Sequence, residues 1–285
     1  MKYANWNVPE RGAEIPRALL AAGCTPLLAA ILHLRGLSDP AAARSFLRGG
    51  AETLTNPLEL TGMVDAVQRL TRAVATGEHV AVYGDYDVDG ITAACLLTDY
   101  LRFRGLTCEL KIPDRIRDGY GLNTAAIDTL AEKGVTLIVT VDCGVTNLEE
   151  TAYAAQRGVD MIVTDHHECR EALPEAEAVV DPKQPDSSGV GTALAGVGVA
   201  FKLVCAMDGD ADKMLARYGD LVAVGTVADV MPLLGENRFI TRCGLQKIAA
   251  GDCRPGFLAL AEEAGVRDKP FTASTVGFSL APRIN

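Results

Sequence analysis

From residue 79 onward, short runs of β-branched and other apolar residues alternate with longer segments that have helical periodicity. This alternation predicts a parallel β-sheet whose strands are joined by crossover helices. The chain is therefore predicted to adopt an α/β fold. The strands are expected at 80–83, 107–112, 135–141, 159–164 and 178–180, and the helices between them at 91–104, 124–133 and 147–157.

Helical segments are expected on both sides of this sheet region. Before it, apolar residues recur at helical spacing over 15–22, 26–34 and 63–75, and Ser38-Asp39-Pro40 is typical of a helix start. After it, a loop over 184–192 leads to helices from 194 to about 260. We interpret residues 1–75 as a helical N-terminal segment and residues 76–285 as one catalytic domain.

The first strand of the sheet runs directly into an acidic turn, Gly84-Asp85-Tyr86-Asp87-Val88-Asp89-Gly90. Three carboxylates at this spacing repel one another unless a cation is present, and hard divalent cations prefer carboxylate oxygen. A calcium-binding EF-hand is excluded because its twelfth loop position, which needs Glu, is Leu96, and because a strand precedes the motif. The remaining alternative to a metal site is a solvated acidic turn.

Two later strands also end in potential ligands, at Asp142 and at Asp165-His166-His167, and Asp229 closes a further apolar run. Because the carboxyl ends of parallel strands share one edge of the sheet, these groups are expected to converge. Each has an ordinary alternative: a helix cap for Asp142, a surface pair for the histidines, and a cap or buried hydrogen bond for Asp229. Together they predict a site for manganese or a similar cation, with two ions bound.

Composition limits the class of protein. The 27 basic and 37 acidic residues give a net charge of −10, which argues against a general nucleic-acid coat protein but not against an enzyme that engages phosphates through metals. The eight cysteines form no C-x-x-C pair, which indicates reduced thiols. No signal peptide and no apolar run of about 18 residues is present, so a cytoplasmic protein without a membrane anchor is expected.

The strand-end motifs resemble those of the DHH phosphoesterase superfamily, whose sheet is Rossmann-like. They are Gly84-Asp85-Tyr86-Asp87-Val88-Asp89-Gly90, Val141-Asp142-Cys143-Gly144 and Val163-Thr164-Asp165-His166-His167-Glu168. Further segments resemble its single-strand-specific DNA exonucleases over nearly the whole chain: Pro113-Asp114-Arg115 leading to Gly119-Tyr120-Gly121, Leu194-Ala195-Gly196-Val197-Gly198-Val199-Ala200-Phe201-Lys202, Thr226-Val227-Ala228-Asp229-Val230-Met231-Pro232-Leu233 and Ala281-Pro282-Arg283-Ile284-Asn285.

This resemblance implies roles for individual residues. Asp142 would bridge two Mn²⁺ or Mg²⁺ ions, His167 would stabilise the charge that develops on the scissile phosphate, and Asp165 would orient the histidines without binding metal. Metal-activated water would attack phosphorus in line. The implied metal ligands are Asp85, Asp87, Asp89, Asp142, His166 and Asp229, and the implied catalytic residues are Asp142, His166 and His167.

The resemblance also implies contacts with nucleic acid. Arg115 and Arg117 would hold a phosphate and Tyr120 would stack on a base, although a solvated loop and a packed tyrosine are the alternatives. Arg283 and Asn285 would touch the DNA backbone. Relatives continue into a phosphate-binding domain and an oligonucleotide-binding fold, so this chain is expected to lack those parts.

The implied activity is metal-dependent 5′→3′ hydrolysis of single-stranded DNA to mononucleotides, in repair and recombination. Single-strand-binding protein and a RecQ-type helicase are the implied partners. A phosphoesterase acting on short oligonucleotides, cyclic dinucleotides or small phosphate esters is the alternative. Those relatives carry a histidine where this chain has Tyr83.

Overall fold

The computed structural model describes residues 15–117, 119 and 121–285. The chain divides into two compact units, Met1–Thr53 and Leu54–Asn285. The smaller unit contains α1 (Arg17–Ala21), α2 (Pro26–Leu34) and α3 (Pro40–Arg48). These three helices enclose a small core of their own, made by Leu19, Ala29, Leu32 and Ala43. As expected, Asp39 caps the start of α3, where its carboxylate accepts a hydrogen bond from the amide of Ala42 at 2.8 Å.

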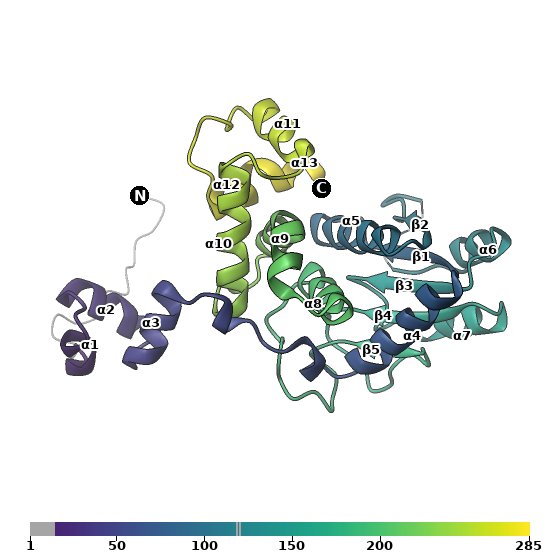
Figure 1. Cartoon of the computed structure of the whole chain (residues 1–285), viewed down its shortest axis with the longest axis horizontal. Coiled ribbons are helices and arrows are strands. Elements are labelled where there is room, and N and C mark those ends of the chain that lie inside the picture. The colour runs from purple at the N-terminus through teal and green to yellow at the C-terminus, as the bar shows by residue number, and fades with distance from the viewer. Residues whose placement is uncertain (1–14, 118, 120) are drawn as a thin grey trace. The chain divides into compact units, whose positions relative to one another are not determined.

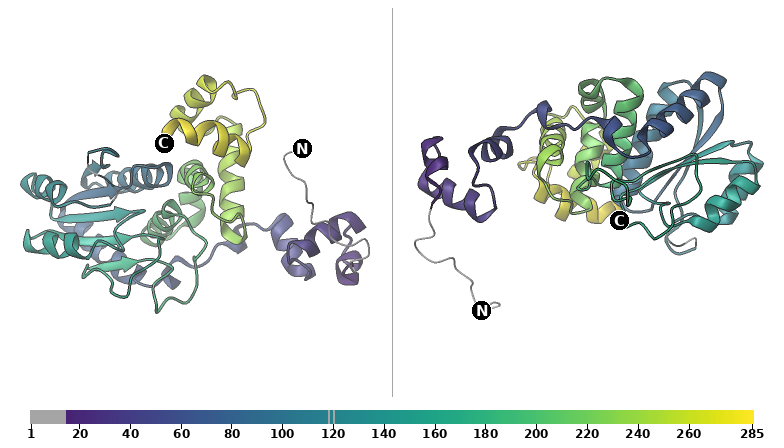
Figure 2. Two further views of the ribbon diagram at one scale, coloured as in Figure 1. Left: turned by 180° about the vertical axis from the view of Figure 1, so that it is seen from behind. Right: turned by 90° about the horizontal axis from the view of Figure 1, so that it is seen from below.

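The larger unit is built on a five-stranded parallel sheet in the order β2-β1-β3-β4-β5 (Figure 1). The predicted parallel α/β fold is therefore confirmed. Figure 2 shows the same strands side by side from two further directions. Their bounds are β1 (His79–Gly84), β2 (Thr107–Lys111), β3 (Leu137–Val141), β4 (Asp160–Thr164) and β5 (Ala178–Val180).

Both faces of the sheet are covered by helices, which explains why its strands are apolar almost throughout. Alternate residues of β1 enter different cores: Val80 and Val82 pack with α4 (Met63–Thr76), α5 (Val88–Phe103) and α8 (Gly196–Asp208). Ala81 and Tyr83 pack on the other face. That face is covered by α6 (Thr124–Glu132) and α7 (Leu148–Gln156). The α4 helix thus belongs to the core of the larger unit, and a domain boundary at residue 75 stays a prediction.

The helices that follow the sheet pack beside α5 and complete this unit. The principal ones are α9 (Ala211–Ala228) and α10 (Gly235–Ala249), which pack on each other, and α9 also packs on α5 and α8. The chain then forms α11 (Pro255–Glu263), α12 (Ala273–Thr275), the π-helical turn η3 (Val276–Leu280) and α13 (Ala281–Ile284). Among the described residues, no helix combines the length and the apolar character needed to cross a membrane.

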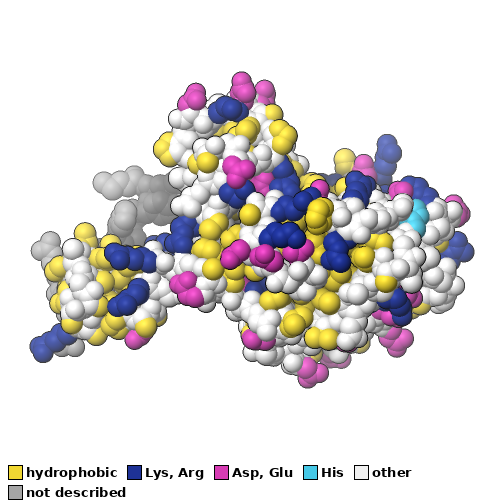
Figure 3. Space-filling model, in the orientation of Figure 1, with side chains coloured by type: hydrophobic (Ala, Val, Ile, Leu, Met, Phe, Trp, Pro, Cys, Tyr) yellow, Lys and Arg dark blue, Asp and Glu magenta, His cyan; other side chains and the backbone are white. Residues whose placement is uncertain are grey.

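Acidic and basic side chains lie interspersed over the face of the larger unit that Figure 3 shows. Some charged side chains of the larger unit are paired across neighbouring elements. Arg217 of α9 donates to Asp99 of α5 at 2.9 Å, and Lys213 lies 2.9 Å from Asp208. The face that Figure 3 shows is therefore a mixed-charge surface.

Candidate metal centre

Three neighbouring strands deliver acidic residues to one edge of the sheet. Gly84, Val141 and Thr164, the last residues of β1, β3 and β4, are paired in register. The residues that follow them are Asp85, Asp142 and Asp165. All three are almost fully buried. The predicted convergence of the strand-end acids is a direct consequence of this register.

Asp87 and Asp89 are placed by the start of α5, which begins at Val88, three residues before the helix expected from the sequence. Asp87 caps this helix and accepts a hydrogen bond from the amide of Gly90 at 3.0 Å. Gly90 lies against the backbone of Asp85, where a Cβ would come within 2.6 Å of its atoms. The early start therefore puts Asp89 in the first helical turn, turned toward α8.

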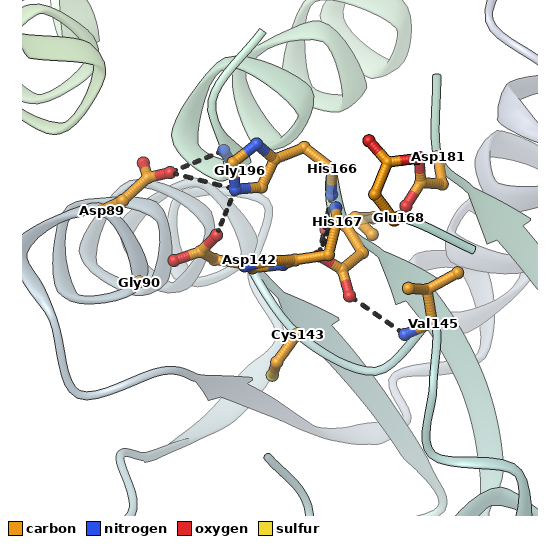
Figure 4. A network of polar contacts seen from close by, with 12 residues as sticks. Asp89, Gly90, Asp142, Cys143, Val145, His166, His167, Glu168, Asp181 and Gly196 are labelled. Atoms are coloured by element: carbon orange, nitrogen blue, oxygen red, sulfur yellow. Dashed lines mark hydrogen bonds and ion pairs between the residues drawn. The ribbon is translucent and has the colours of Figure 1, made fainter. Parts of the chain in front are cut away.

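The carboxylate of Asp89 is held by the N-terminus of α8. Its two oxygens accept hydrogen bonds from the amides of Gly196, at 2.7 Å, and Val197, at 2.9 Å. Figure 4 shows the contact with Gly196. Such amides carry the positive end of the helix dipole and stabilise negative charge. The sequence motif around Gly196 suggests no role for these amides. It is their contact with Asp89 that fixes α8 against the site.

Asp142 occupies the centre of the group. Its Oδ1 lies 3.0 Å from Nε2 of His166, and the same nitrogen lies 3.8 Å from Asp89 and 3.7 Å from Asp229. In Figure 4 the carboxylates of Asp89 and Asp142 both point toward the His166 ring. Asp142 has φ of 60°, a left-handed conformation that aspartate tolerates better than most residues. Gly196 leaves room for it, because a Cβ there would lie 2.5 Å from Asp142.

The potential ligand atoms gather in three overlapping groups, each with its atoms within 4.8 Å of one another. Asp142 belongs to two of the groups, and His166 also belongs to two. The implied ligands are thus all brought together, and a bridging role for Asp142 stays a prediction. The groups are Asp85–Asp87–Asp142, Asp142–His166–His167 and Asp89–His166–Asp229.

Burial and mutual repulsion make these acids unfavourable as free carboxylates. Burial raises the pKa of Asp85 above its ordinary value. Burial followed by the charges of neighbouring aspartates raises the pKa of Asp89 and Asp142 far more. The pKa of Asp229 is also raised by burial. A bound cation would reverse this balance by favouring the charged form of every one of these groups.

The donor set fits a divalent metal ion. Oδ1 of Asp85 and Oδ1 of Asp142 are buried and accept no hydrogen bond from the described residues, although His166 lies close to the latter. Buried polar atoms are normally satisfied, and an exception points to an absent ion or water. Four or more carboxylates with one or two imidazoles are ligands that suit Mn²⁺ and, through their oxygens, Mg²⁺.

Asp165 contacts the backbone of His166 and the ring of His167, and its role in orienting the histidines stays a prediction. It accepts hydrogen bonds from the amides of His166 and Val145, and its Oδ1 lies 2.7 Å from Nδ1 of His167. This hydrogen bond raises the pKa of His167. Burial alone would raise the pKa of Asp165, but its contacts with His167 bring that pKa below the ordinary value. The pair therefore favours an imidazolium beside the carboxylate.

The predicted nucleic-acid contacts lie partly at this edge. The Arg115 guanidinium stacks 4.8 Å from the ring of Tyr86, which separates Asp85 from Asp87. Oδ1 of Asn285 accepts a hydrogen bond from the amide of Val88 at 3.1 Å, so the end of the chain reaches the start of α5. Two further residues predicted to contact nucleic acid are exposed: the amide of Arg117 donates to Asp114, and the Arg283 side chain donates to the Ser279 carbonyl. The last one, Tyr120, lies outside the described residues.

Asp181 lies near the site, but it is not among the site residues predicted from the sequence. Asp181 follows β5 as the other acids follow their strands, and it is fully buried. Its Oδ1 accepts from the amide of Lys183 at 2.8 Å, whereas Oδ2 has no partner among the described residues. Burial raises the pKa of Asp181 to about 6. The signal that would have found it is the repeated pattern of a strand followed directly by aspartate.

Comparison with known proteins supports this assignment. Residues 79–226 match the model of the DHH family, N-terminal domain. The chain is 40% identical over 262 residues to the single-stranded-DNA-specific exonuclease RecJ of Bacillus subtilis, a match that covers 92% of this chain and 33% of the relative. It is 38% identical over 281 residues to RecJ of Escherichia coli, covering 93% and 48% respectively.

Solved structures agree with these sequence matches. RecJ of Thermus thermophilus in complex with Mn²⁺ matches with a TM-score of 0.75 and 32% identity, covering 93% of this chain and 37% of that one. Exonuclease RecJ bound to manganese matches with a TM-score of 0.70 and 37% identity, covering 82% and 58%. The chain spans between about a third and a half of the length of the curated relatives described above. With its fold, its strand-end acids and the family match in agreement, this chain belongs to the DHH family.

Proposed function

We propose that this chain carries the catalytic site of a metal-dependent exonuclease that degrades single-stranded DNA from the 5′ end to mononucleotides, in DNA repair and recombination. The observation that carries the proposal is the pair of ligand groups that share Asp142 at the carboxyl edge of the sheet. The similarity to RecJ exonucleases, two of them solved with manganese, supports both the substrate and the metal.

In this proposal Asp85, Asp87, Asp89, Asp142, His166 and Asp229 hold two Mn²⁺ or Mg²⁺ ions. When bound, such ions supply a water of lowered pKa and neutralise the attacking and leaving oxygens of a phosphodiester. The protein's own contribution is to hold the ligands in place: α8 amides fix Asp89, and the register of β1 and β3 fixes Asp85 beside Asp142.

His167 and Arg115 supply positive charge toward the phosphate. Asp165 raises the pKa of His167 through their hydrogen bond, and the imidazolium that results attracts a phosphate oxygen. Arg115 stacks over the ring of Tyr86, which stands between Asp85 and Asp87 in the sequence. Both cations offset the acidic character of the site when a polyanion approaches. Arg117, Tyr120, Arg283 and Asn285 complete the proposed contacts with the strand.

A cytoplasmic location and an interaction with single-strand-binding protein or a RecQ-type helicase also belong to this proposal. The location follows from the scattered cysteines and the sequence pattern, and the partners follow from the family resemblance alone. Co-purification of either partner with the tagged chain, compared with an untagged chain in the same mixture, would test the interaction.

The proposal is tested by degradation of 5′-labelled single-stranded DNA with Mn²⁺ or Mg²⁺. Duplex DNA, short RNA and a cyclic dinucleotide serve as competing substrates, and a 3′-labelled strand reports the direction. We expect metal-dependent release of labelled mononucleotide from the 5′-labelled single strand. Asp142→Ala should be inactive, whereas Asp252→Ala, at an exposed aspartate outside the site, should match the parent. Cleavage of only RNA or the cyclic dinucleotide would contradict the proposal and favour a small-substrate phosphoesterase.

A further inference from the structure

The helix that presents Asp229 ends in an unusual way. After α9, the amide of Val230 donates to the Val227 carbonyl and the amide of Met231 donates to the Thr226 carbonyl, both at 3.2 Å. These two bonds form a Schellman motif in which Asp229 is the C-cap and Val230 has a left-handed φ of 59°. Glycine normally occupies this left-handed position because it lacks a Cβ. Here a β-branched residue occupies it.

Valine is strained in that conformation. Among the described residues other than glycine, only Asp142 and Val230 have positive φ. Aspartate tolerates the left-handed region, but for a β-branched residue it is a true outlier. Strain of this kind persists where the surrounding structure imposes it, and it is concentrated at ligand clamps and active sites. Both left-handed residues belong to the metal centre or adjoin it.

Packing does not compensate for this strain. The Val230 side chain is 86% exposed, more than that of any other valine in the described chain, while the neighbouring Met231 packs against the core. A glycine or asparagine would end the helix with less strain and expose less apolar surface. The features that would ordinarily explain a valine, burial or β-structure, are both missing at this position.

The location of Val230 indicates what its side chain can meet. It directly follows Asp229, whose carboxylate lies 3.7 Å from the His166 ring, so Val230 adjoins the metal centre in the chain. The acids, with their metal ions, and the cations His167 and Arg115 together engage the phosphate in the proposed function. The nucleotide that carries this phosphate also has apolar surfaces, which are the carbons of its sugar and the faces of its base. Only an apolar side chain can bury these surfaces favourably.

We propose that Val230 is a substrate-contacting residue whose methyl groups pack against the sugar and base of the single-stranded DNA nucleotide held beside Asp229. The inference rests on the proposed function and adds to it one contact that charge alone cannot provide. Binding of the strand would bury the exposed methyl groups, which would account for the presence of valine in a strained turn. A rival role is that branching merely stiffens the turn and so fixes Asp229.

Four substitutions separate these roles. Val230→Asn and Val230→Gly both suit the left-handed turn but remove the apolar side chain. Val230→Thr keeps the branching and shape but adds a hydroxyl, and Val230→Ile keeps the branching and the apolar surface. The matched control is Phe103→Asn, which removes a half-exposed apolar side chain at the far end of α5, about 22 Å along the helix from Val88.

The readouts are binding of a fluorescent phosphorothioate single strand with Mn²⁺, KM and kcat on ordinary single-stranded DNA, and Tm with and without Mn²⁺. We expect Val230→Asn and Val230→Gly to weaken strand binding and raise KM about three- to tenfold. Their Tm should equal or exceed that of the parent, because strain is relieved. Val230→Ile should bind within about twofold of the parent, Val230→Thr should lie between, and Phe103→Asn should bind normally.

Two results would overturn the inference. One is unchanged strand binding in Val230→Asn. The other is a loss of Mn²⁺-induced stabilisation that parallels the loss of binding, because this would show that Val230 acts through Asp229. A parent that binds the strand but does not cut it would defeat the proposed activity and leave the binding comparison among the variants valid. A parent that does not bind the strand would defeat both.

Discussion

The two ends of the same strands carry acids of opposite character. At the amino ends, Glu78 immediately precedes β1 and Asp160 begins β4, and both are paired with the buried Arg69 of α4 at 2.8 and 2.9 Å. At the carboxyl ends, the buried oxygens of Asp85 and Asp142 accept no hydrogen bond within the described chain. The acids at the amino edge are thus paired, whereas at the carboxyl edge Asp85 and Asp142 each keep a buried oxygen without a hydrogen bond from the described residues, and Asp165 has a charged partner in His167.

The pKa values follow this difference. The hydrogen bond with Arg69 lowers the pKa of Glu78, whereas burial raises the pKa of Asp85 and Asp142. An acid with an internal partner contributes to the stability of the fold. A buried acid without one lowers that stability until a partner arrives from solution. The contrast distinguishes Glu78 and Asp160 from Asp85 and Asp142, and the following changes test it.

The largest effect is expected for Asp142→Asn. The substitution removes the central carboxylate and with it several kcal/mol of stabilisation of the reacting phosphate, which corresponds to a loss of about 10³-fold or more in kcat. Without metal, the variant should unfold at the same or a higher temperature than the parent, because a buried, repelled charge is gone. Nuclease assays and thermal unfolding measure both. A destabilised metal-free variant would show that Asp142 has a structural role instead.

Arg69→Met should produce the opposite pattern. Removing the guanidinium takes away the buried partner that Glu78 and Asp160 share, for which a loss of about 2–4 kcal/mol in the free energy of unfolding is expected. The kcat of the folded variant should remain within about twofold of the parent, because the network lies at the amino ends of the strands. Urea unfolding and activity per folded molecule are the measurements. A kcat per folded molecule that falls by more than about twofold would show that the acids at the amino edge also influence the reaction.

Gly196→Ala tests how closely α8 must approach the metal centre. Its new Cβ would lie 2.5 Å from Asp142, so either helix or carboxylate must shift, at an expected cost of about 1–3 kcal/mol. We expect weaker stabilisation by Mn²⁺ and a lower kcat. Gly256→Ala is the matched control, because nothing lies within 4 Å of a Cβ there and alanine favours the α11 helix. Equal behaviour of the two variants would mean that the close approach of α8 is unnecessary.

Most of the fold could be predicted from the sequence because strand and helix periodicities are local. The apolar runs around Val82, Val139 and Ile162 became neighbouring parallel strands as expected. The start of α5 was predicted three residues late. Its first turn, Val88-Asp89-Gly90, contains residues that also favour turns, and the helix is selected there by the Asp87 cap and by contact of Gly90 with Asp85. Such tertiary contacts leave no periodic signal.

The site was predictable to the extent that it depends on strand ends. Parallel topology alone brings Asp85, Asp142 and Asp165 to one edge, which is why their convergence could be predicted. The amides of α8 that bind Asp89 come from more than a hundred residues away, and a backbone donor has no residue type to reveal it. Likewise, the left-handed Val230 could not be anticipated, because the sequence at the end of α9 lacks the glycine that usually marks this turn.

The smallest expected effect concerns the pH dependence of the paired edge. Arg69 lowers the pKa of Glu78 below its ordinary value of 4.5, so the charged form is favoured in the folded state. A depressed acid contributes stability that is fully present above its unfolded pKa and is lost as pH falls through the folded value. The parent should therefore exceed Glu78→Gln in free energy of unfolding by up to about 1 kcal/mol at pH 7, since part of this network is solvent-exposed. The difference should begin to shrink as the pH falls below about 4.5 and should approach zero only below the lowered pKa of Glu78 in the folded state, where the folded protein also binds the proton. Urea titrations of both proteins between pH 3 and 7 measure this difference in the free energy of unfolding.

A difference that stays constant over that pH range would mean that shape and hydrogen bonding, and not charge, account for the pairing of Glu78 with Arg69. The electrostatic contrast between the two edges of the sheet would then rest on the acids of the carboxyl edge alone.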